Sequence, residues 1–143
     1  MQNQFKTQFK TIVKSPLSKV WDALTNPTLV KEYLFGSQLV TNWIPGHPII
    51  FKGEWEGTPY EDKGTVIEYF HEQNLAYSYF SNWSGKEDMP ENYLLVTYEV
   101  TEIPEGTELT ITQTNYDEDK AAHSLKSWES IMDGMKTMLT NQK

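Results

Sequence analysis

The sequence of 143 residues has no cysteine and no arginine, so all twelve of its basic residues are lysines. Without cysteine the chain can form no disulfide, thiolate nucleophile, zinc knuckle or iron–sulfur cluster. Phosphate backbones are bound by clustered positive charge, often from arginine, whereas the formal net charge here is −8. We therefore expect neither a nucleic-acid partner nor an acidic substrate.

Long apolar runs are also missing. The longest, residues 48–51 and 93–98, are far too short to cross a bilayer. The polar start at residues 1–4 is not typical of a secretory signal peptide. These observations predict a cytoplasmic protein without membrane insertion.

The first quarter of the chain carries one strand signal and two helix signals. Residues 5–13 alternate between two faces, which predicts a half-buried strand. Ser15-Pro16 is typical of a helix start, with Ser15 as N-cap and Pro16 at the first helical position. A helical face follows, made of Leu17, Val20, Trp21 and Leu24. Asn26-Pro27 repeats the start signal and predicts a second short helix over residues 28–34.

The rest of the chain reads as strands followed by one long helix. Alternation and turn residues predict strands at 38–43, 48–55, 60–70, 75–81, 93–102 and 107–115. The longer connection 82–92 is the best candidate for a mobile loop. A helix over residues 119–141 is predicted by one apolar stripe along its whole length: Ala121, Leu125, Trp128, Met132, Met135 and Leu139.

This order of elements predicts a single α+β domain over residues 1–143. Short links suit antiparallel neighbours, so we expect a strongly bent antiparallel sheet wrapped around the long C-terminal helix. The two short helices after the first strand would close one end. Trp128 is expected on the sheet-facing side of the last helix.

Several motifs carry a resemblance to a known family. Ser15-Pro16, Lys19-Val20-Trp21, Ala23-Leu24-Thr25 and Pro27 resemble the opening of the SRPBCC superfamily, also called START-like or birch-pollen-allergen-like. The chain is most similar to the small bacterial form of the activator of heat-shock-protein ATPase homologue domain. Further support comes from Trp43-x-Pro45-Gly46, residues 62–66 and residues 88–92.

The resemblance implies a helix-grip fold whose elements meet around one cavity. Aromatic residues make up 13% of the chain, and many lie on those elements. We expect the following side chains to line a ligand cavity: Trp21, Tyr33, Phe35, Trp43, Phe51, Trp55, Tyr77, Tyr79, Trp83, Trp128, Met132 and Met135. The alternative is that these rings and methionines simply fill the core.

Other chemistry has weaker support in the sequence. His47, His71 and His123 lack the short spacings of a metal site, so no metal is expected, and His123 is expected in solvent or at a rim. No glycine-rich phosphate loop or nucleophile elbow occurs, and no cofactor is expected. Glu54 and Glu56 are expected to point to water. Glu68 and Glu99 interrupt apolar strands, so each could face either the cavity or solvent.

Three functions remain open at this point. The first is non-catalytic binding of a small hydrophobic or aromatic molecule in an internal cavity. The second, implied by the family resemblance, is an interaction module that contacts a chaperone ATPase. The third is an enzyme of the cyclase or aromatase type, which would need buried polar groups facing the cavity and rests on fold analogy alone.

Overall fold

The computed structural model describes residues 5–81 and 83–141, with the backbone alone at Trp55. In chain order the elements are β1 (Phe5–Val13), α1 (Leu17–Thr25), α2 (Pro27–Tyr33), β2 (Gln38–Thr41), β3 (Pro48–Trp55), β4 (Thr58–Phe70), β5 (Asn74–Tyr79), the short 3-10 helix η1 (Pro90–Asn92), β6 (Leu94–Ile103), β7 (Gly106–Asn115) and α3 (Glu118–Asn141). The predicted α+β class and element order are confirmed.

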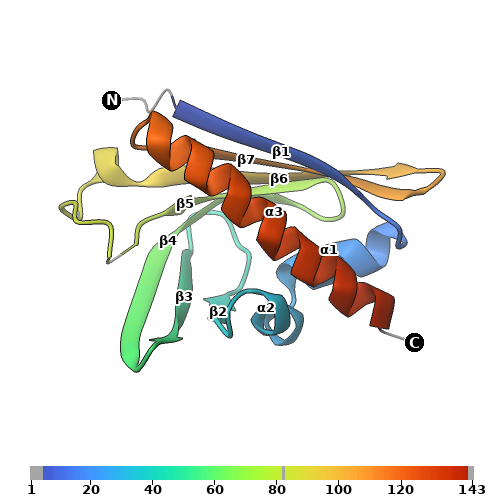
Figure 1. Ribbon diagram of the computed structural model, residues 1–143, viewed down its shortest axis with the longest axis horizontal. Coiled ribbons are helices and arrows are strands. Elements are labelled where there is room, and N and C mark those ends of the chain that lie inside the picture. Colours follow the sequence, from blue (N-terminus) through green and yellow to red (C-terminus); the bar gives the residue numbers. More distant parts are fainter. Residues whose placement is uncertain (1–4, 82, 142–143) are drawn as a thin grey trace.

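One open antiparallel sheet carries the fold, in the strand order β1-β7-β6-β5-β4-β3-β2. The long helix α3 crosses one face of this sheet diagonally, and α1 and α2 lie beside its C-terminal half (Figure 1). Trp128 faces the sheet, as predicted, and only 8% of its surface is exposed. The helix-grip arrangement is therefore confirmed.

The helix starts differ slightly from the expectation. The helix α1 begins at Leu17, with Pro16 as its N-cap and no side-chain cap, so the prediction of Ser15 as N-cap was wrong by one residue. The start of α2 is as predicted, because the Asn26 side chain accepts a hydrogen bond of 3.0 Å from the Thr28 backbone N–H. Val20, Trp21 and Leu24 of α1 are buried in the core.

The predicted apolar stripe of α3 is wrong in its first two turns. The buried residues of this helix are Ser124, Trp128, Ile131, Met132, Met135 and Leu139, whereas Leu125 is 44% exposed. The helix thus turns a polar face inward at its N-terminal end. The reason is that this part of α3 faces a cavity, described below, and not packed side chains.

The sheet bends along β4, which is also joined to Phe80, directly after β5, by a bridge at Lys63. The first half of β4 pairs with β3 up to Thr65, and its second half pairs with β5 from Val66, with a register shift between Val66 and Glu68. At the corner, a Cβ on Gly64 would lie 1.7 Å from the Ser78 carbonyl oxygen. Only glycine permits this close approach of the two strands.

We expect Gly64→Ala to lower the free energy of unfolding by about 1–3 kcal/mol or more, because the added methyl group overlaps the backbone of β5. Gly134→Ala in α3 is the matched control. A Cβ there meets Tyr33 at 3.5 Å, an ordinary contact, so helix propensity should raise the stability by up to about 1 kcal/mol. Urea unfolding measures both changes. A Gly64→Ala protein as stable as the wild type would contradict the close approach.

Candidate functional site

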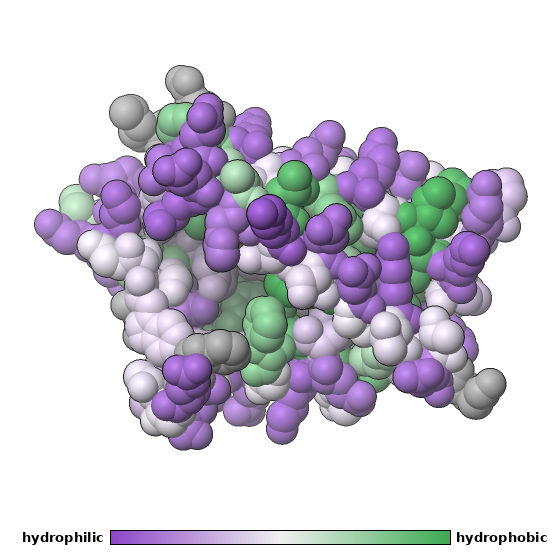
Figure 2. Space-filling view, in the orientation of Figure 1, coloured by the Kyte–Doolittle hydropathy of each residue, from purple (hydrophilic) through white to green (hydrophobic). Residues whose placement is uncertain are grey.

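A cavity of about 560 Å³ opens between the N-terminal half of α3 and the sheet. Figure 2 shows a hollow on this face of the molecule, below the start of α3, with hydrophobic residues inside it. The strand residues that line it are Phe51, Tyr60, Asp62, Tyr77, Tyr79, Leu94, Val96, Tyr98, Gln113 and Asn115. The helix contributes Lys120, His123, Ser124, Ser127, Trp128 and Ile131. Leu34, Phe35, Ser37, Trp83 and Tyr116 complete the lining.

The buried end of the cavity is built from rings that hold one another in place. Tyr98 stands edge-on to both Tyr77 and Trp128, with 5.9 Å between ring centroids in each pair. The hydroxyl groups of Tyr77 and Tyr98 are hydrogen-bonded at 3.1 Å. Phe51 packs against Tyr77 at 5.6 Å. Edge-to-face pairs contribute about 0.5–1.5 kcal/mol beyond the area that they bury, so the two Tyr98 pairs stabilise this wall.

Burial raises the pKa of the phenols in this wall. Desolvation raises the pKa of Tyr98 to about 12 and also raises the pKa of Tyr77 well above its usual value. On the same strand as Tyr77, the Tyr79 hydroxyl donates a hydrogen bond to the Asp62 carboxylate. Burial raises the pKa of Tyr79, and the negative charge of Asp62 raises it further. At neutral pH these groups can donate or accept hydrogen bonds but cannot act as phenolate bases.

A chain of hydrogen bonds ties α3 to the sheet beside the cavity. The Trp128 Nε1–H donates to the Gln113 side-chain oxygen at 2.8 Å, and the Gln113 amide donates to the Asn115 side-chain oxygen at 3.1 Å. The Asn115 amide in turn donates to the Thr7 hydroxyl at 3.1 Å, and that hydroxyl donates to the Ala121 carbonyl at 2.8 Å. These contacts fix the position of Trp128 in the cavity wall.

The exposed lining residues mark the mouth of the cavity. Phe35 and Trp83 are 61% and 50% exposed, and Lys120 and His123 on α3 are also exposed. His123 therefore lies at a rim, as predicted. Phe35 and Gly36 both adopt positive φ angles, 53° and 74°, directly after α2. Trp83 packs edge-on against Tyr60, with 5.5 Å between ring centroids.

The structure brings together six of the twelve side chains that were predicted to line the cavity. Phe35, Phe51, Tyr77, Tyr79, Trp83 and Trp128 line the cavity. Trp21, Met132 and Met135 are buried in the core away from it. Tyr33 and Trp43 line only a neighbouring space of about 10 Å³. The side chain of Trp55 lies outside the described residues.

The residues away from the cavity have structural partners. The indole N–H groups of Trp21 and Trp43 donate to the Tyr69 hydroxyl at 2.9 Å and to the Thr25 carbonyl at 3.0 Å. The Tyr33 hydroxyl donates to the Ala23 carbonyl at 2.8 Å. Buried indole N–H and phenol O–H groups need hydrogen-bond partners. Because these three side chains have such partners within the protein, their rings can pack in the core.

Several parts of the lining were not predicted from the sequence, among them Tyr60, Tyr98, Tyr116 and the polar face of α3. Tyr98 lies in an apolar run of β6, and its two-residue alternation with Val96 and Leu94 was the available signal. The polar face could have been found from the helical spacing of Lys120, Ser124, Ser127 and Ile131. Hydrophobic patterning alone does not reveal that these residues line a cavity.

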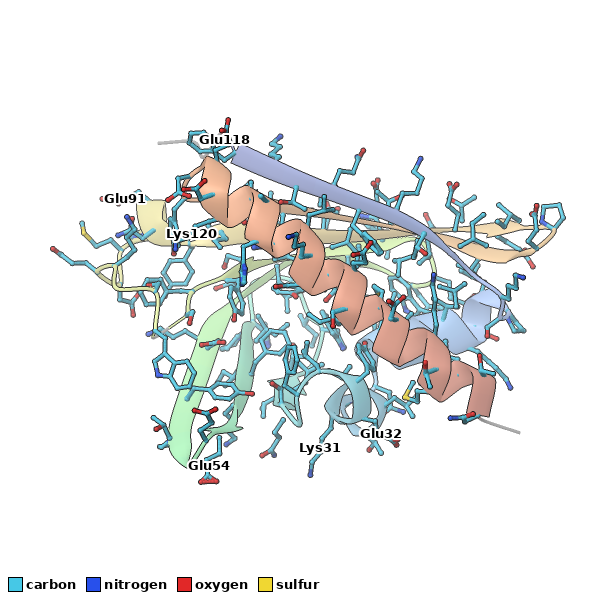
Figure 3. The ribbon with its side chains drawn as sticks, viewed as in Figure 1. Lys31, Glu32, Glu54, Glu91, Glu118 and Lys120 are labelled. Carbon is cyan, nitrogen blue, oxygen red and sulfur yellow. The ribbon has the colours of Figure 1, made fainter. Side chains whose placement is uncertain are left out.

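The acidic candidates lie elsewhere. Glu54 and Glu56 are exposed, as predicted, and the labelled Glu54 points away from the cavity at the far end of β3 (Figure 3). Glu68 accepts a hydrogen bond of 2.5 Å from Asn74, and Glu99 is exposed; neither lines the cavity. Within residues 5–81 and 83–141, no cluster of three His, Asp or Glu side chains could hold a metal. In the same ranges no helix is long and apolar enough to span a membrane.

Comparison with known proteins places the chain in a family. The model of the family described as Activator of Hsp90 ATPase homolog 1-like protein matches residues 14–140. The chain belongs to this family. No curated protein matches the sequence.

Solved structures share the fold of this member of the Activator of Hsp90 ATPase homolog 1-like family. ChR145 from Cytophaga hutchinsonii is 42% identical over 99% of this chain and 97% of its own, with a TM-score of 0.85. MLL2253 from Mesorhizobium loti is 20% identical over 96% and 98%, with a TM-score of 0.78. DynU16, from the dynemicin biosynthetic locus, is 16% identical over 96% of this chain and 48% of its own, with a TM-score of 0.80. The last two show the fold alone, and the expected SRPBCC relationship is confirmed.

The raised phenol pKa values predict how the stability of this family member depends on pH. Because the folded state holds the Tyr98 proton up to about pH 12 and the unfolded chain loses it near pH 10, the stabilisation is complete below pH 10. It is lost as the pH rises from 10 toward 12, by about 2–3 kcal/mol for Tyr98. Urea unfolding from pH 8 to 11.5 should show a steeper decline for the wild type than for Tyr98→Phe. Equal slopes would contradict the assignment.

Proposed function

We propose that the protein binds a small, largely apolar or aromatic molecule in the cavity beside α3 without transforming it. The observation that carries this proposal is the cavity itself. Its volume of about 560 Å³ falls within the range of about 300–1,000 Å³ that is usual for small-molecule sites. A ring wall of Phe51, Tyr77, Tyr98 and Trp128 offers flat apolar contact together with a few polar atoms.

The state of the polar groups supports binding over catalysis. The phenols of Tyr77 and Tyr98 are neutral and bonded to each other, so neither is a base at neutral pH. Gln113 and Asn115 take part in the series of hydrogen bonds that holds Trp128. Asp62 is engaged by Tyr79. An enzyme of the cyclase or aromatase type would need a freer acid or base among these groups.

The interaction-module hypothesis rests on the family description, which names an activator of a chaperone ATPase. No contact or surface described above favours that partner over a small molecule. A chaperone ATPase assay with and without the protein separates the two, since ligand binding predicts no stimulation. The cytoplasmic location stays a prediction from composition.

Intrinsic fluorescence tests the proposal, because Trp128 and Trp83 line the cavity while Trp21 and Trp43 do not. We expect at least one member of a panel of fatty acids, aromatic polyketides and sterols to change the tryptophan emission in a saturable way. Trp128→Phe should remove much of this change. Trp43→Phe, the matched control, should keep it.

Native mass spectrometry of the purified protein gives a second readout, an added mass from a co-purified lipophile. The proposal is wrong if no compound changes the emission and no added mass is found. The same result combined with stimulation of a chaperone ATPase would establish the interaction module instead.

A further inference from the structure

The face of α3 that lines the cavity changes from polar to apolar along the helix. Lys120, His123, Ser124 and Ser127 line it over the first turns, and Trp128 and Ile131 line it further on. Positions spaced by three and four residues lie on one helix face, so these side chains form a single stripe. A ligand lying along this stripe would meet hydrogen-bond donors at one end and apolar groups at the other.

Ser124 is the unusual member of this stripe. Its side chain is buried, with 7% of the residue exposed, and it lines the cavity. Among the described residues its hydroxyl is the one buried side-chain polar atom without a hydrogen-bond partner. Buried polar groups in native proteins almost always have partners, so an unpaired one beside a cavity calls for an explanation.

The neighbouring polar groups already have partners inside the protein. Gln113 accepts from Trp128 and donates to Asn115, and Asn115 donates to the Thr7 hydroxyl. The Ala121 carbonyl, one turn before Ser124, accepts from Thr7. The Ser124 hydroxyl therefore has no hydrogen-bond partner in this network.

The net charge of −8 led us to expect no acidic ligand, but the cavity face of α3 carries one fixed charge, the positive charge of Lys120, which favours a negative or electron-rich group on that side. Lys120 makes no ion pair with a carboxylate among residues 5–81 and 83–141. It lies in the first turn of α3, on a different side of the helix from Glu118 (Figure 3). The carboxylate that lines the cavity, Asp62, is engaged by Tyr79 on the sheet wall. Asp117 is used as a cap, because its side chain accepts from the Lys120 backbone N–H.

We propose that the ligand is amphipathic and carries a carboxylate, which the Ser124 hydroxyl and the Lys120 ammonium bind while the apolar body packs on Trp128 and Ile131. This inference rests on the proposed function and names its ligand class. Hydrogen bonds between charged and neutral groups in a partly dry site are stronger than neutral pairs, so the carboxylate supplies both affinity and orientation.

Three compounds with one naphthalene body test the proposal: 1-naphthaleneacetic acid, 1-naphthaleneacetamide and 2-(1-naphthyl)ethylamine. They present a carboxylate, a neutral amide and an ammonium to the same site. Isothermal titration calorimetry should show the acid binding about tenfold or more tightly than the amide, the ratio expected for one charge-assisted hydrogen bond. The amine should bind more weakly than the amide.

Two variants assign the preference to named groups. Ser124→Ala and Lys120→Gln should each lower the affinity for the acid by about three- to tenfold while changing the affinity for the amide less than about twofold. Lys126→Gln is the matched control, because Lys126 is exposed on the same helix outside the cavity and its loss changes the net charge equally. It should leave both affinities unchanged.

The outcomes separate this inference from the proposed function. Equal binding of acid and amide, or a preference for the acid that survives both variants, overturns the carboxylate site and leaves ligand binding intact. Tighter binding of the amine also overturns it. If none of the three compounds binds, both the inference and the proposed function fail for naphthalene-sized ligands. A preference for the acid that both variants reduce and Lys126→Gln does not supports the inference.

Discussion

The close approach of β4 and β5 at Gly64 is the constraint on which the rest of the structure depends. Without a Cβ at this position, β4 can approach β5 closely while it pairs with β3 along its first half, so one antiparallel sheet turns a corner. A straight helix laid across a bent sheet cannot contact it evenly along its length. The C-terminal half of α3 packs on the core through Met132, Met135 and Leu139, and the N-terminal half stands over a hollow.

An unfilled space of this kind is unfavourable, because atoms around it lose dispersion contacts. It persists here because the large side chains that could collapse into it are tethered. Trp128 is held by Gln113, Tyr77 and Tyr98 hold each other, and Tyr79 is held by Asp62. Each tether joins side chains that lie apart in the sequence, so the cavity is a property of the tertiary structure and of no single element.

The sequence predicted the elements well because each has a local signal. Asn26-Pro27 caps α2, the alternation from residue 5 to 13 forms β1, and all the strand pairs are antiparallel, as the short links suggested. The site was predicted less well, because the sequence does not show whether an aromatic ring lines a cavity or packs in the core. Trp21 and Trp128 both follow helical apolar spacing, yet one donates to Tyr69 in the core and the other faces the cavity. Only the packing of distant elements decides between them.

The error over Leu125 shows what hydrophobic periodicity measures. Hydrophobic periodicity identifies the face of a helix that avoids water. It assumes that this face packs against other side chains along its whole length. Where the inward face of the helix lines a cavity, that assumption fails, and a polar residue such as Ser124 can be buried without packing against other side chains. The exposure of Leu125 and the burial of the unpaired Ser124 therefore have one cause. The packed C-terminal half of α3 sets the rotation of the whole helix about its axis. Its N-terminal half presents to the cavity whatever side chains that orientation brings there.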